Sequence, residues 1–189
     1  MDAKKFATID DLLSVPEEHR AELINGELIY HGQASPRHGK AQRTLGGILD
    51  PFDRKGGTGG PGGWWILTEA GVRYSLRTAC RHDLAGWKRD RLPLLPDDEY
   101  VSITPDWVCE ILSPSNRNND LVHKKAVLHH AQVPHYWIID PNDKTISVHR
   151  WAEAGYINIA NCVAGQRAKL EPFEAVEVDI AYLLGDTDL

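Results

Sequence analysis

The chain has 189 residues, of which 42% are hydrophobic and 25% are charged, and this composition is typical of one soluble globular domain. The formal net charge of −6 disfavours a protein that coats nucleic acid without specificity, because phosphate binding requires a basic surface. The sequence shows no signal-peptide core, no run near the roughly 20 apolar residues of a membrane span, and only three scattered cysteines. We therefore expect a single domain over residues 1–189 in the reducing cytoplasm, without a membrane segment.

A short helix is expected near the N-terminus. Thr8 and Asp11 have the spacing of a capping box, which predicts a helix over residues 10–13. Pro16 limits this helix, and its role is interpreted as structural.

A β-hairpin is expected over residues 21–30. Asn25-Gly26 lies between two apolar runs, which is the strongest short-range hairpin signal. A two-residue turn there pairs Ile24 with Glu27 and Glu22 with Ile29. Two interpretations of Glu22 follow: it projects beside the next helix, or it is a solvated glutamate on an edge strand.

A longer helix is expected over residues 36–49. Ser35-Pro36 places an N-cap before a proline at the first helical position, and Pro51 ends the pattern. His38 in the first turn either reaches a phosphate or bound water, or is a surface residue.

Two short basic segments are candidates for a local basic groove that contacts phosphates, with a solvated face as the alternative interpretation. The first lies on the expected helix and contains Arg37, Lys40 and Arg43, and the second contains Lys88, Arg89 and Arg91.

The middle of the chain predicts a loop and three strands. The glycine-rich residues 56–63 lack the Lys-Ser/Thr ending of a phosphate-binding P-loop and predict a flexible loop. Strands are expected over residues 64–68, 71–76 and 79–85. Asp83 on the third strand is a carboxylate at the entrance to an apolar segment.

Residues 106–112 predict a central strand that is covered on both sides, since both of its faces are largely apolar. Period-two alternation places Trp107, Cys109 and Ile111 on one face and Asp106, Val108, Glu110 and Leu112 on the other. Glu110 lies near the middle of this strand. An unpaired carboxylate in such a position would protonate or bind a partner.

A helix is expected from about Asp120 to Ala131, after a turn at residues 115–119. Lys124 lies on the apolar arc of this helix, and Lys125 lies at the edge of the arc. Taken alone, Lys124 fits a lysine whose stem covers the core while its ammonium reaches water. The nearby Glu110 shifts the interpretation towards a paired buried charge.

The remaining chain predicts strands over residues 135–140, 145–151 and 156–163, the last two as an antiparallel pair. Residues 167–189 are expected to be a polar, irregular tail that closes the domain. The order of the elements predicts an α/β fold. Its mixed β-sheet carries a helix on each face and an N-terminal hairpin.

Asp83, Glu110 and Lys124 have the chemistry that phosphodiester hydrolysis requires. Carboxylate oxygens suit Mg²⁺, which activates a bound water and neutralises charge on the phosphate, and a lysine adds positive charge at the transition state. Spacing alone makes this a weak signal, because such triplets are common.

Several motifs are more specific. In chain order they are NGELIYHGQASPRHGKAQ, GGPGGWWIL, DLAGWKRDRLP, DWVCEILSPSN, DLVHKK and VPHYWIIDP. Together they resemble the Uma-two-type family of restriction endonucleases in the PD-(D/E)XK nuclease superfamily, over about residues 8–183. The resemblance implies a restriction-endonuclease-like mixed sheet flanked by helices, with a metal site at one end.

The resemblance also implies roles for single residues. Asp83 corresponds to the aspartate of the first motif and Glu110 to the acid of the second, so both would bind the metal. The lysine usually found two residues later is replaced by Leu112, and Lys124 on the following helix takes its role. The early-hairpin Glu22 would be an auxiliary ligand or an acid behind the ligands, and His38 belongs to the Ser-Pro-Arg-His segment.

One position departs from the family pattern: His82 precedes Asp83 where the family has proline. Proline at this position shapes the backbone and binds no metal. The departure therefore affects the orientation expected for Asp83 rather than its role.

Three functions are compatible with these features. The first is a Mg²⁺- or Mn²⁺-dependent endonuclease that cleaves DNA as a homodimer, because cutting both strands favours two-fold symmetry. The second is a non-catalytic binding or dimerisation module. The third is a zinc hydrolase based on His123, His129, His130 and His135, whose spacing is not that of HExxH.

Overall fold

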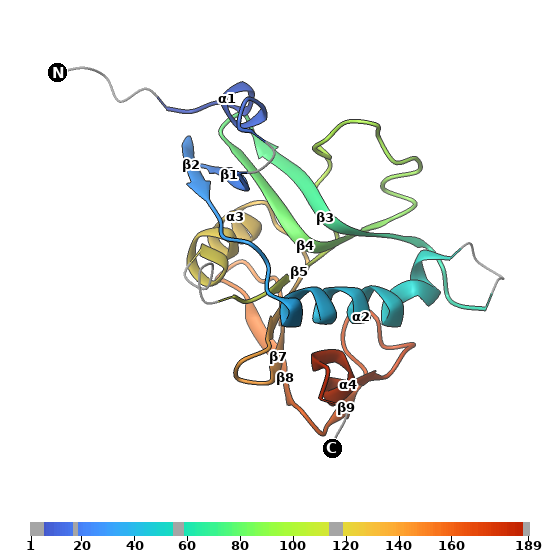
Figure 1. Cartoon of the computed structure of the whole chain (residues 1–189). Coiled ribbons are helices and arrows are strands. Elements are labelled where there is room, and N and C mark those ends of the chain that lie inside the picture. The colour runs from blue at the N-terminus through green and yellow to red at the C-terminus, as the bar shows by residue number, and fades with distance from the viewer. Residues whose placement is uncertain (1–5, 17–18, 55–58, 114–118, 187–189) are drawn as a thin grey trace.

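The computed structural model describes residues 6–16, 19–54, 59–113 and 119–186. Its helices and strands, drawn in Figure 1, are α1 (Ile9–Leu13), β1 (Ala21–Ile24), β2 (Glu27–Tyr30), α2 (Pro36–Asp53), β3 (Trp64–Ser75), β4 (Thr78–Lys88), β5 (Trp107–Ile111), the π-helix η1 (Asn119–Lys124), α3 (Lys125–His130), β6 (His135–Asp140), β7 (Thr145–Arg150), β8 (Ile157–Val163), β9 (Arg167–Ala168), β10 (Val178–Asp179) and α4 (Ile180–Leu184).

A large mixed sheet organises the chain, with strand order β2-β1-β4-β5-β6-β7-β8 and with β3 paired to β4 outside this path. β5 pairs antiparallel with β4 and parallel with β6. A parallel neighbour requires a crossover connection, and η1 and α3 lie in the segment that joins β5 to β6.

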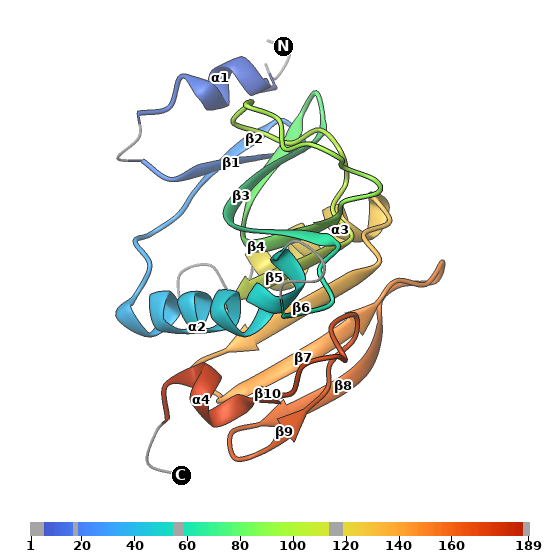
Figure 2. The ribbon, with the colours of Figure 1, turned by 90° about the vertical axis from the view of Figure 1, so that its right-hand side faces the viewer.

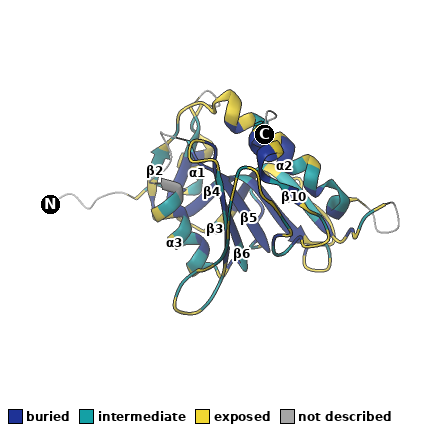
Figure 3. Ribbon diagram, turned by 90° about the horizontal axis from the view of Figure 1, so that it is seen from below, coloured by how far each residue is buried: buried dark blue, intermediate teal, exposed yellow. Residues whose placement is uncertain are grey.

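The two faces of β5 are buried in two different cores, as the alternation predicted. Trp107 and Ile111 pack with Leu45 of α2 in one core, and Val108 packs with Leu128 of α3 in the other. Figures 1 and 2 show α2 and α3 on opposite sides of β5, and Figure 3 shows the buried strands β5 and β6 at the centre of the molecule. The expected α/β fold, with a mixed sheet and a helix on each face, is confirmed.

The N-terminal predictions are confirmed. Thr8 caps α1 through a capping box with Asp11. The hairpin has the predicted register, because Ile24 pairs with Glu27 and Glu22 with Ile29.

Helix α2 extends beyond its predicted end at residue 49 and contains Pro51. A proline so close to the end of a helix removes a single intrahelical donor. The last turn is stabilised by Phe52, whose ring lies 4.8 Å from that of Phe173 between centroids. Packing therefore outweighs the local helix-ending signal.

The expected strands at 64–68 and 71–76 are one strand, β3, which pairs antiparallel with β4. Glu69 lies between the two predicted segments and has a φ of 50°. The interruption of the apolar pattern therefore marks a local distortion inside a strand rather than a loop.

The helix expected at 120–131 is instead the π-helix η1 followed by the α-helix α3. Residues 115–118 of the expected turn and residues 56–58 of the expected glycine-rich loop lie outside the described residues.

The prediction of a polar, irregular tail at 167–189 is wrong for the described residues to 186. They form β9, β10 and α4, and Asp179 caps the N-terminus of α4 while Gly185 ends it with a φ of 79°. Phe173 in this segment lies in the α2-side core against Trp107, with ring centroids 5.0 Å apart. Its buried apolar residues are distributed over a loop, a short strand and a short helix, so they follow no single period in the sequence.

Across the residues that the structure describes, no helix combines the length and apolar character needed to cross a membrane.

Candidate functional site

The candidate site lies where β4 separates from β5. The last pair of this ladder is Leu84 with Cys109, and Asp83 and Glu110 are the residues next to that pair, on the side where the pairing stops. Beyond that point, Oδ2 of Asp83 accepts a hydrogen bond of 2.7 Å from the N–H of Ile111. A small cavity of about 40 Å³ forms here, and His38, Asp83, Glu110 and Lys124 are among the residues that line it. The structure thus gathers four of the predicted site residues.

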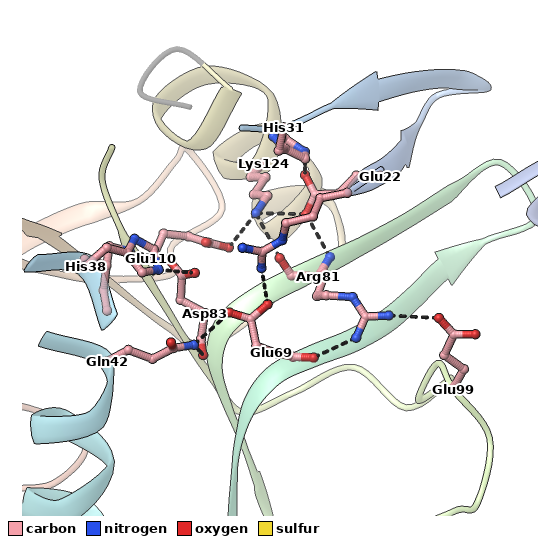
Figure 4. A network of polar contacts seen from close by, with 12 residues as sticks. Glu22, His31, His38, Gln42, Glu69, Arg81, Asp83, Glu99, Glu110 and Lys124 are labelled. Atoms are coloured by element: carbon pink, nitrogen blue, oxygen red, sulfur yellow. Dashed lines mark hydrogen bonds and ion pairs between the residues drawn. The ribbon is translucent and has the colours of Figure 1, made fainter. Parts of the chain in front are cut away.

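Lys124 is the last residue of η1 and points inward. Its side chain is only 5% exposed, and its Nζ lies 2.9 Å from Oε1 of Glu22 and 3.2 Å from Oε1 of Glu110. It also donates a 3.1 Å hydrogen bond to the carbonyl of Arg81 (Figure 4). The interpretation of Lys124 as a paired buried charge is therefore correct.

The local backbone helps to place this ammonium. A π-helical turn is rare and is found frequently at functional sites. Here it lies immediately before α3, whose Leu128 is fully buried in the core. Packing of α3 therefore holds the end of η1, and with it Lys124, against the sheet.

Glu22 is buried and both of its oxygens have partners. Oε1 contacts Lys124 and accepts a 2.8 Å hydrogen bond from the N–H of Arg81, and Oε2 lies 2.8 Å from Nε2 of His31. Burial would raise the pKa of Glu22, but the charge of Lys124 and the bond with His31 outweigh it and lower the pKa well below its ordinary value. Glu22 is thus an ionised partner of Lys124, not a solvated edge residue.

Glu110 is almost fully buried and has the opposite electrostatic behaviour. Burial raises its pKa to about 8, and the nearby charges of Asp83 and Glu22 act in the same direction, while Lys124 opposes them. Without a bound cation, this carboxyl group is mostly protonated at neutral pH.

His38 lies inside the cavity rather than on the surface of α2. Its Nε2 is 3.0 Å from Oδ1 of Asp83, and the residue is 6% exposed. Burial lowers the pKa of His38, but the hydrogen bond and charge of Asp83 prevail and raise it. The placement favours a role at the Asp83 carboxylate.

Three residues that the sequence did not single out complete the site. Arg20 contacts the carboxylate of Glu69. Gln42 of α2 donates hydrogen bonds of 3.0 Å to Oε1 of Glu69 and 2.9 Å to the carbonyl of Asp83. The break between the two strands predicted at 64–68 and 71–76 was the available signal for Glu69.

His82 was also missed as a site residue. It is fully buried on β4, and its Nδ1 lies 2.5 Å from Oε1 of Glu110. Histidine at this position departs from the family pattern, but the contact with Glu110 depends on how β4 and β5 separate.

The basic residues of α2 do not form one continuous surface. Arg37 and Arg43 are exposed. Lys40 instead hydrogen-bonds to Thr44 at 2.9 Å and lies over the ring of Tyr182 in α4, 4.9 Å from its centroid. Arg37 and Arg43 are therefore the members of this segment best placed to meet a partner.

The histidines considered for zinc do not converge. Nε2 of His129 contacts the carbonyl of Ala152, whereas Nδ1 of His135 lies 3.3 Å from Glu171. Among the described residues, the group whose donor atoms lie within 4.8 Å of one another consists of His38, Glu69 and Asp83. Histidine-rich zinc coordination is thus disfavoured.

The charge and donor set of the site fit a divalent cation. The carboxylates are Glu22, Glu69, Asp83 and Glu110, and the permanent cations in contact with them are Arg20 and Lys124. Negative charge is therefore in excess unless protons or a cation are bound. Carboxylate oxygens around a small polar cavity are ligands suited to Mg²⁺ or Mn²⁺.

Comparison with known proteins agrees with this chemistry. The Uma2 family model, described as "Putative restriction endonuclease", matches residues 6–181. The chain belongs to the Uma2 family.

A solved structure resembles this Uma2-family chain over nearly its full length. It is the crystal structure of a protein from Anabaena variabilis, described as a putative nuclease belonging to DUF820. The TM-score is 0.71 at 20% identity, and the match covers 94% of this chain and 97% of the other. At this identity the likeness establishes the fold alone. No curated protein matches the chain.

Proposed function

We propose that this Uma2-family chain is a Mg²⁺-dependent endodeoxyribonuclease of the PD-(D/E)XK superfamily, formed as one domain. The observation that carries the proposal is the cavity lined by Asp83, Glu110 and Lys124, where two carboxylates and a buried ammonium lie together. The family description and the nuclease-like fold support the same reaction class.

Asp83 and Glu110 are the residues proposed to hold Mg²⁺ or Mn²⁺. The cation would activate a water molecule and neutralise charge on the phosphate. Asp83 is held for this role by the N–H of Ile111 and by His38. Glu22 is proposed to act behind the ligands, since its oxygens already contact Lys124, Arg81 and His31.

Lys124 is proposed to stabilise the transition state. Its ammonium is held by Glu22 and Glu110 at the edge of the cavity, so it is oriented before substrate arrives. A charge held in a buried site requires little reorganisation during the reaction and acts more strongly than in water.

DNA is the proposed substrate, and Arg37 and Arg43 on the exposed side of α2 would contact its phosphates. Lys40 would join them if it leaves Tyr182, and His38 would act at the reacting phosphate beside Asp83. A homodimer would place two such sites for cleavage of both strands. Within the described residues, Cys80, Cys109 and Cys162 form no disulfide, which supports the proposed cytoplasmic location.

A non-catalytic binding or dimerisation module is the alternative. The formal net charge of −6 favours it, because an acidic protein gains little from phosphate attraction. A module without catalysis has no need to bind a divalent cation at Asp83.

The test incubates purified protein with plasmid, linear duplex and single-stranded DNA in the presence of Mg²⁺, Mn²⁺ or EDTA. Metal-dependent cleavage that disappears in Asp83→Asn and Lys124→Met supports the proposal. Cleavage that survives in both variants indicates a contaminating nuclease. Absence of cleavage and of Mn²⁺ binding by the wild type would favour the module.

A further inference from the structure

Nδ1 of His82 lies 2.5 Å from Oε1 of Glu110, and Nε2 of His82 lies 2.7 Å from the hydroxyl of Tyr74. In the proposed nuclease mechanism Glu110 is a metal ligand, whereas His82 and Tyr74 have no role. His82 is fully buried, so this row of contacts is isolated from water at its centre.

The contacts give the imidazole one orientation. Both ring nitrogens are engaged, one by a residue of β5 and the other by a residue of β3, while His82 itself belongs to β4. The Tyr74 ring also meets the His82 ring edge-on, with centroids 5.9 Å apart and an interplanar angle of 70°. Three strands therefore clamp the ring.

The fixed orientation of the His82 ring also restricts the carboxyl group of Glu110. Its Oε1 is held by His82 on one side and by Lys124, at 3.2 Å, on the other. Within the described part of the chain, no hydrogen bond or ion pair involves Oε2 of Glu110. With Oε1 anchored, rotation of the carboxyl group is restricted, and the second oxygen remains available at the cavity that Asp83 also lines.

With the cation bound, Glu110 would be ionised, and the contacts of His82 fit that state. A neutral imidazole carries one N–H, and an ionised carboxylate can only accept, so Nδ1–H donates to Glu110 and Nε2 accepts from the hydroxyl of Tyr74. Burial raises the pKa of Tyr74 well above its ordinary value, which keeps that hydroxyl a donor. A ligand carboxylate is typically oriented by hydrogen bonds of this kind from residues behind it.

We propose that His82, braced by Tyr74, is a positioning residue that orients Glu110 as a ligand for the divalent cation. The proposal rests on the proposed metal-dependent function. His82 would contact neither substrate nor metal, and its substitution would change the affinity of the protein for the metal.

Two substitutions at position 82 separate orientation from packing. The amide nitrogen of asparagine sits the same number of bonds from Cβ as Nδ1 of histidine, so His82→Asn keeps a donor towards Glu110. The amide of glutamine matches Nε2 instead, so His82→Gln keeps the reach to Tyr74 and removes the donor at the Nδ1 position. Asparagine is also the smaller side chain and leaves the larger void.

Calorimetric titration of Mn²⁺ into the full chain, with urea unfolding of the same samples, tests the proposal. We expect His82→Gln to weaken Mn²⁺ binding by about 10- to 100-fold. His82→Asn should stay within about threefold of the wild type, although its larger void should make it the less stable variant. A purely structural role predicts the reverse order of affinity, or equal affinity, and either result overturns the proposal.

Tyr74→Phe provides the matched test of the brace, because it keeps the ring and removes only the hydroxyl. We expect a severalfold loss of Mn²⁺ affinity, smaller than that of His82→Gln, and unchanged affinity would overturn the role of Tyr74. A wild type that binds no Mn²⁺ would overturn the metal-dependent function and the role of His82 together. If the wild type binds Mn²⁺ and substitution of His82 or of Tyr74 leaves that affinity unchanged, only the positioning role is overturned.

Discussion

Nζ of Lys124 lies 2.9 Å from Oε1 of Glu22, so a buried ion pair joins the π-helix η1 to the N-terminal hairpin. Both side chains are almost fully withdrawn from water. Removing one member of such a pair leaves a buried charge without compensation, which typically costs about 3–5 kcal/mol. The hairpin is therefore coupled to the candidate site through Lys124.

Lys124→Met is expected to lower DNA cleavage by about a hundredfold or more, the scale of removing one oriented electrostatic interaction. It should also reduce the free energy of unfolding by a few kcal/mol, because Glu22 and Glu110 lose their shared cation. The rate constant of DNA cleavage under single-turnover conditions measures the first effect, and urea unfolding measures the second.

Lys125→Met is the matched control for this prediction. Lys125 is the next residue along the helix and is only partly buried. Its replacement should change stability by about 0.5 kcal/mol or less and leave cleavage intact. Comparable activity of the Lys124 and Lys125 variants would return Lys124 to a packing role.

Asp83→Asn is expected to weaken Mn²⁺ binding by at least about tenfold, since the amide cannot supply the charge of the carboxylate ligand. The proposed cation would then depend on Glu110 alone. Isothermal titration calorimetry measures the affinity, and Asp50→Asn, at a partly buried position paired with Arg54 on α2, is the control. Equal Mn²⁺ affinity in wild type and Asp83→Asn would exclude Asp83 as a ligand.

Glu22 is expected to make stability depend on acid pH. Burial opposes its ionisation, but Lys124 and His31 lower its pKa below the ordinary 4.5. A carboxyl group with a lowered folded pKa stabilises the protein above that ordinary value and loses its contribution as the pH falls further. Urea unfolding between about pH 7 and 3 should therefore show a flatter decline in Glu22→Gln than in the wild type.

Glu27→Gln, at an exposed position on β2 of the same hairpin, controls for a simple change in surface charge. It should retain the wild-type slope below about pH 4.5. Identical slopes for wild type and Glu22→Gln would mean that Glu22 is not held ionised by Lys124.

Glu110 is expected to release a proton when the cation binds. Burial raises its pKa to about 8, so the carboxyl group is mostly protonated in the metal-free protein at neutral pH. Mn²⁺ affinity should therefore increase as the pH rises towards about 8, and binding near pH 7 should release up to about one proton. Calorimetry in buffers of different ionisation enthalpy detects it, and Glu110→Gln should show no such release.

Arg37→Gln combined with Arg43→Gln is expected to weaken DNA binding equally on different sequences, because phosphate contacts carry little sequence information. The slope of log affinity against log salt should fall by about 0.9 for each phosphate that the protein no longer neutralises. Fluorescence anisotropy at several salt concentrations measures both, with Arg167→Gln on β9 as an exposed control. A changed sequence preference with an unchanged salt slope would contradict phosphate binding by these arginines.

Local patterns in the sequence were sufficient for much of the framework. The Asn25-Gly26 turn set the register of the hairpin, and period-two alternation predicted that β5 is buried on both faces. Helical periodicity placed Lys124 towards the core even though the segment is a π-helix. Each of these signals arises from backbone preference or burial within a few neighbouring residues, so it can be read without knowing the strand order.

The tertiary structure decided which side chains meet. The order β1-β4-β5, and the separation of β4 from β5 on the N-terminal side of Leu84, bring Glu22 and His82 to Lys124 and Glu110. The C-terminal segment joins the core through Phe173, which follows no short periodic pattern. Contacts between distant segments depend on how strands are ordered and where their pairing stops, and these are properties of the packed sheet rather than of any local stretch of sequence.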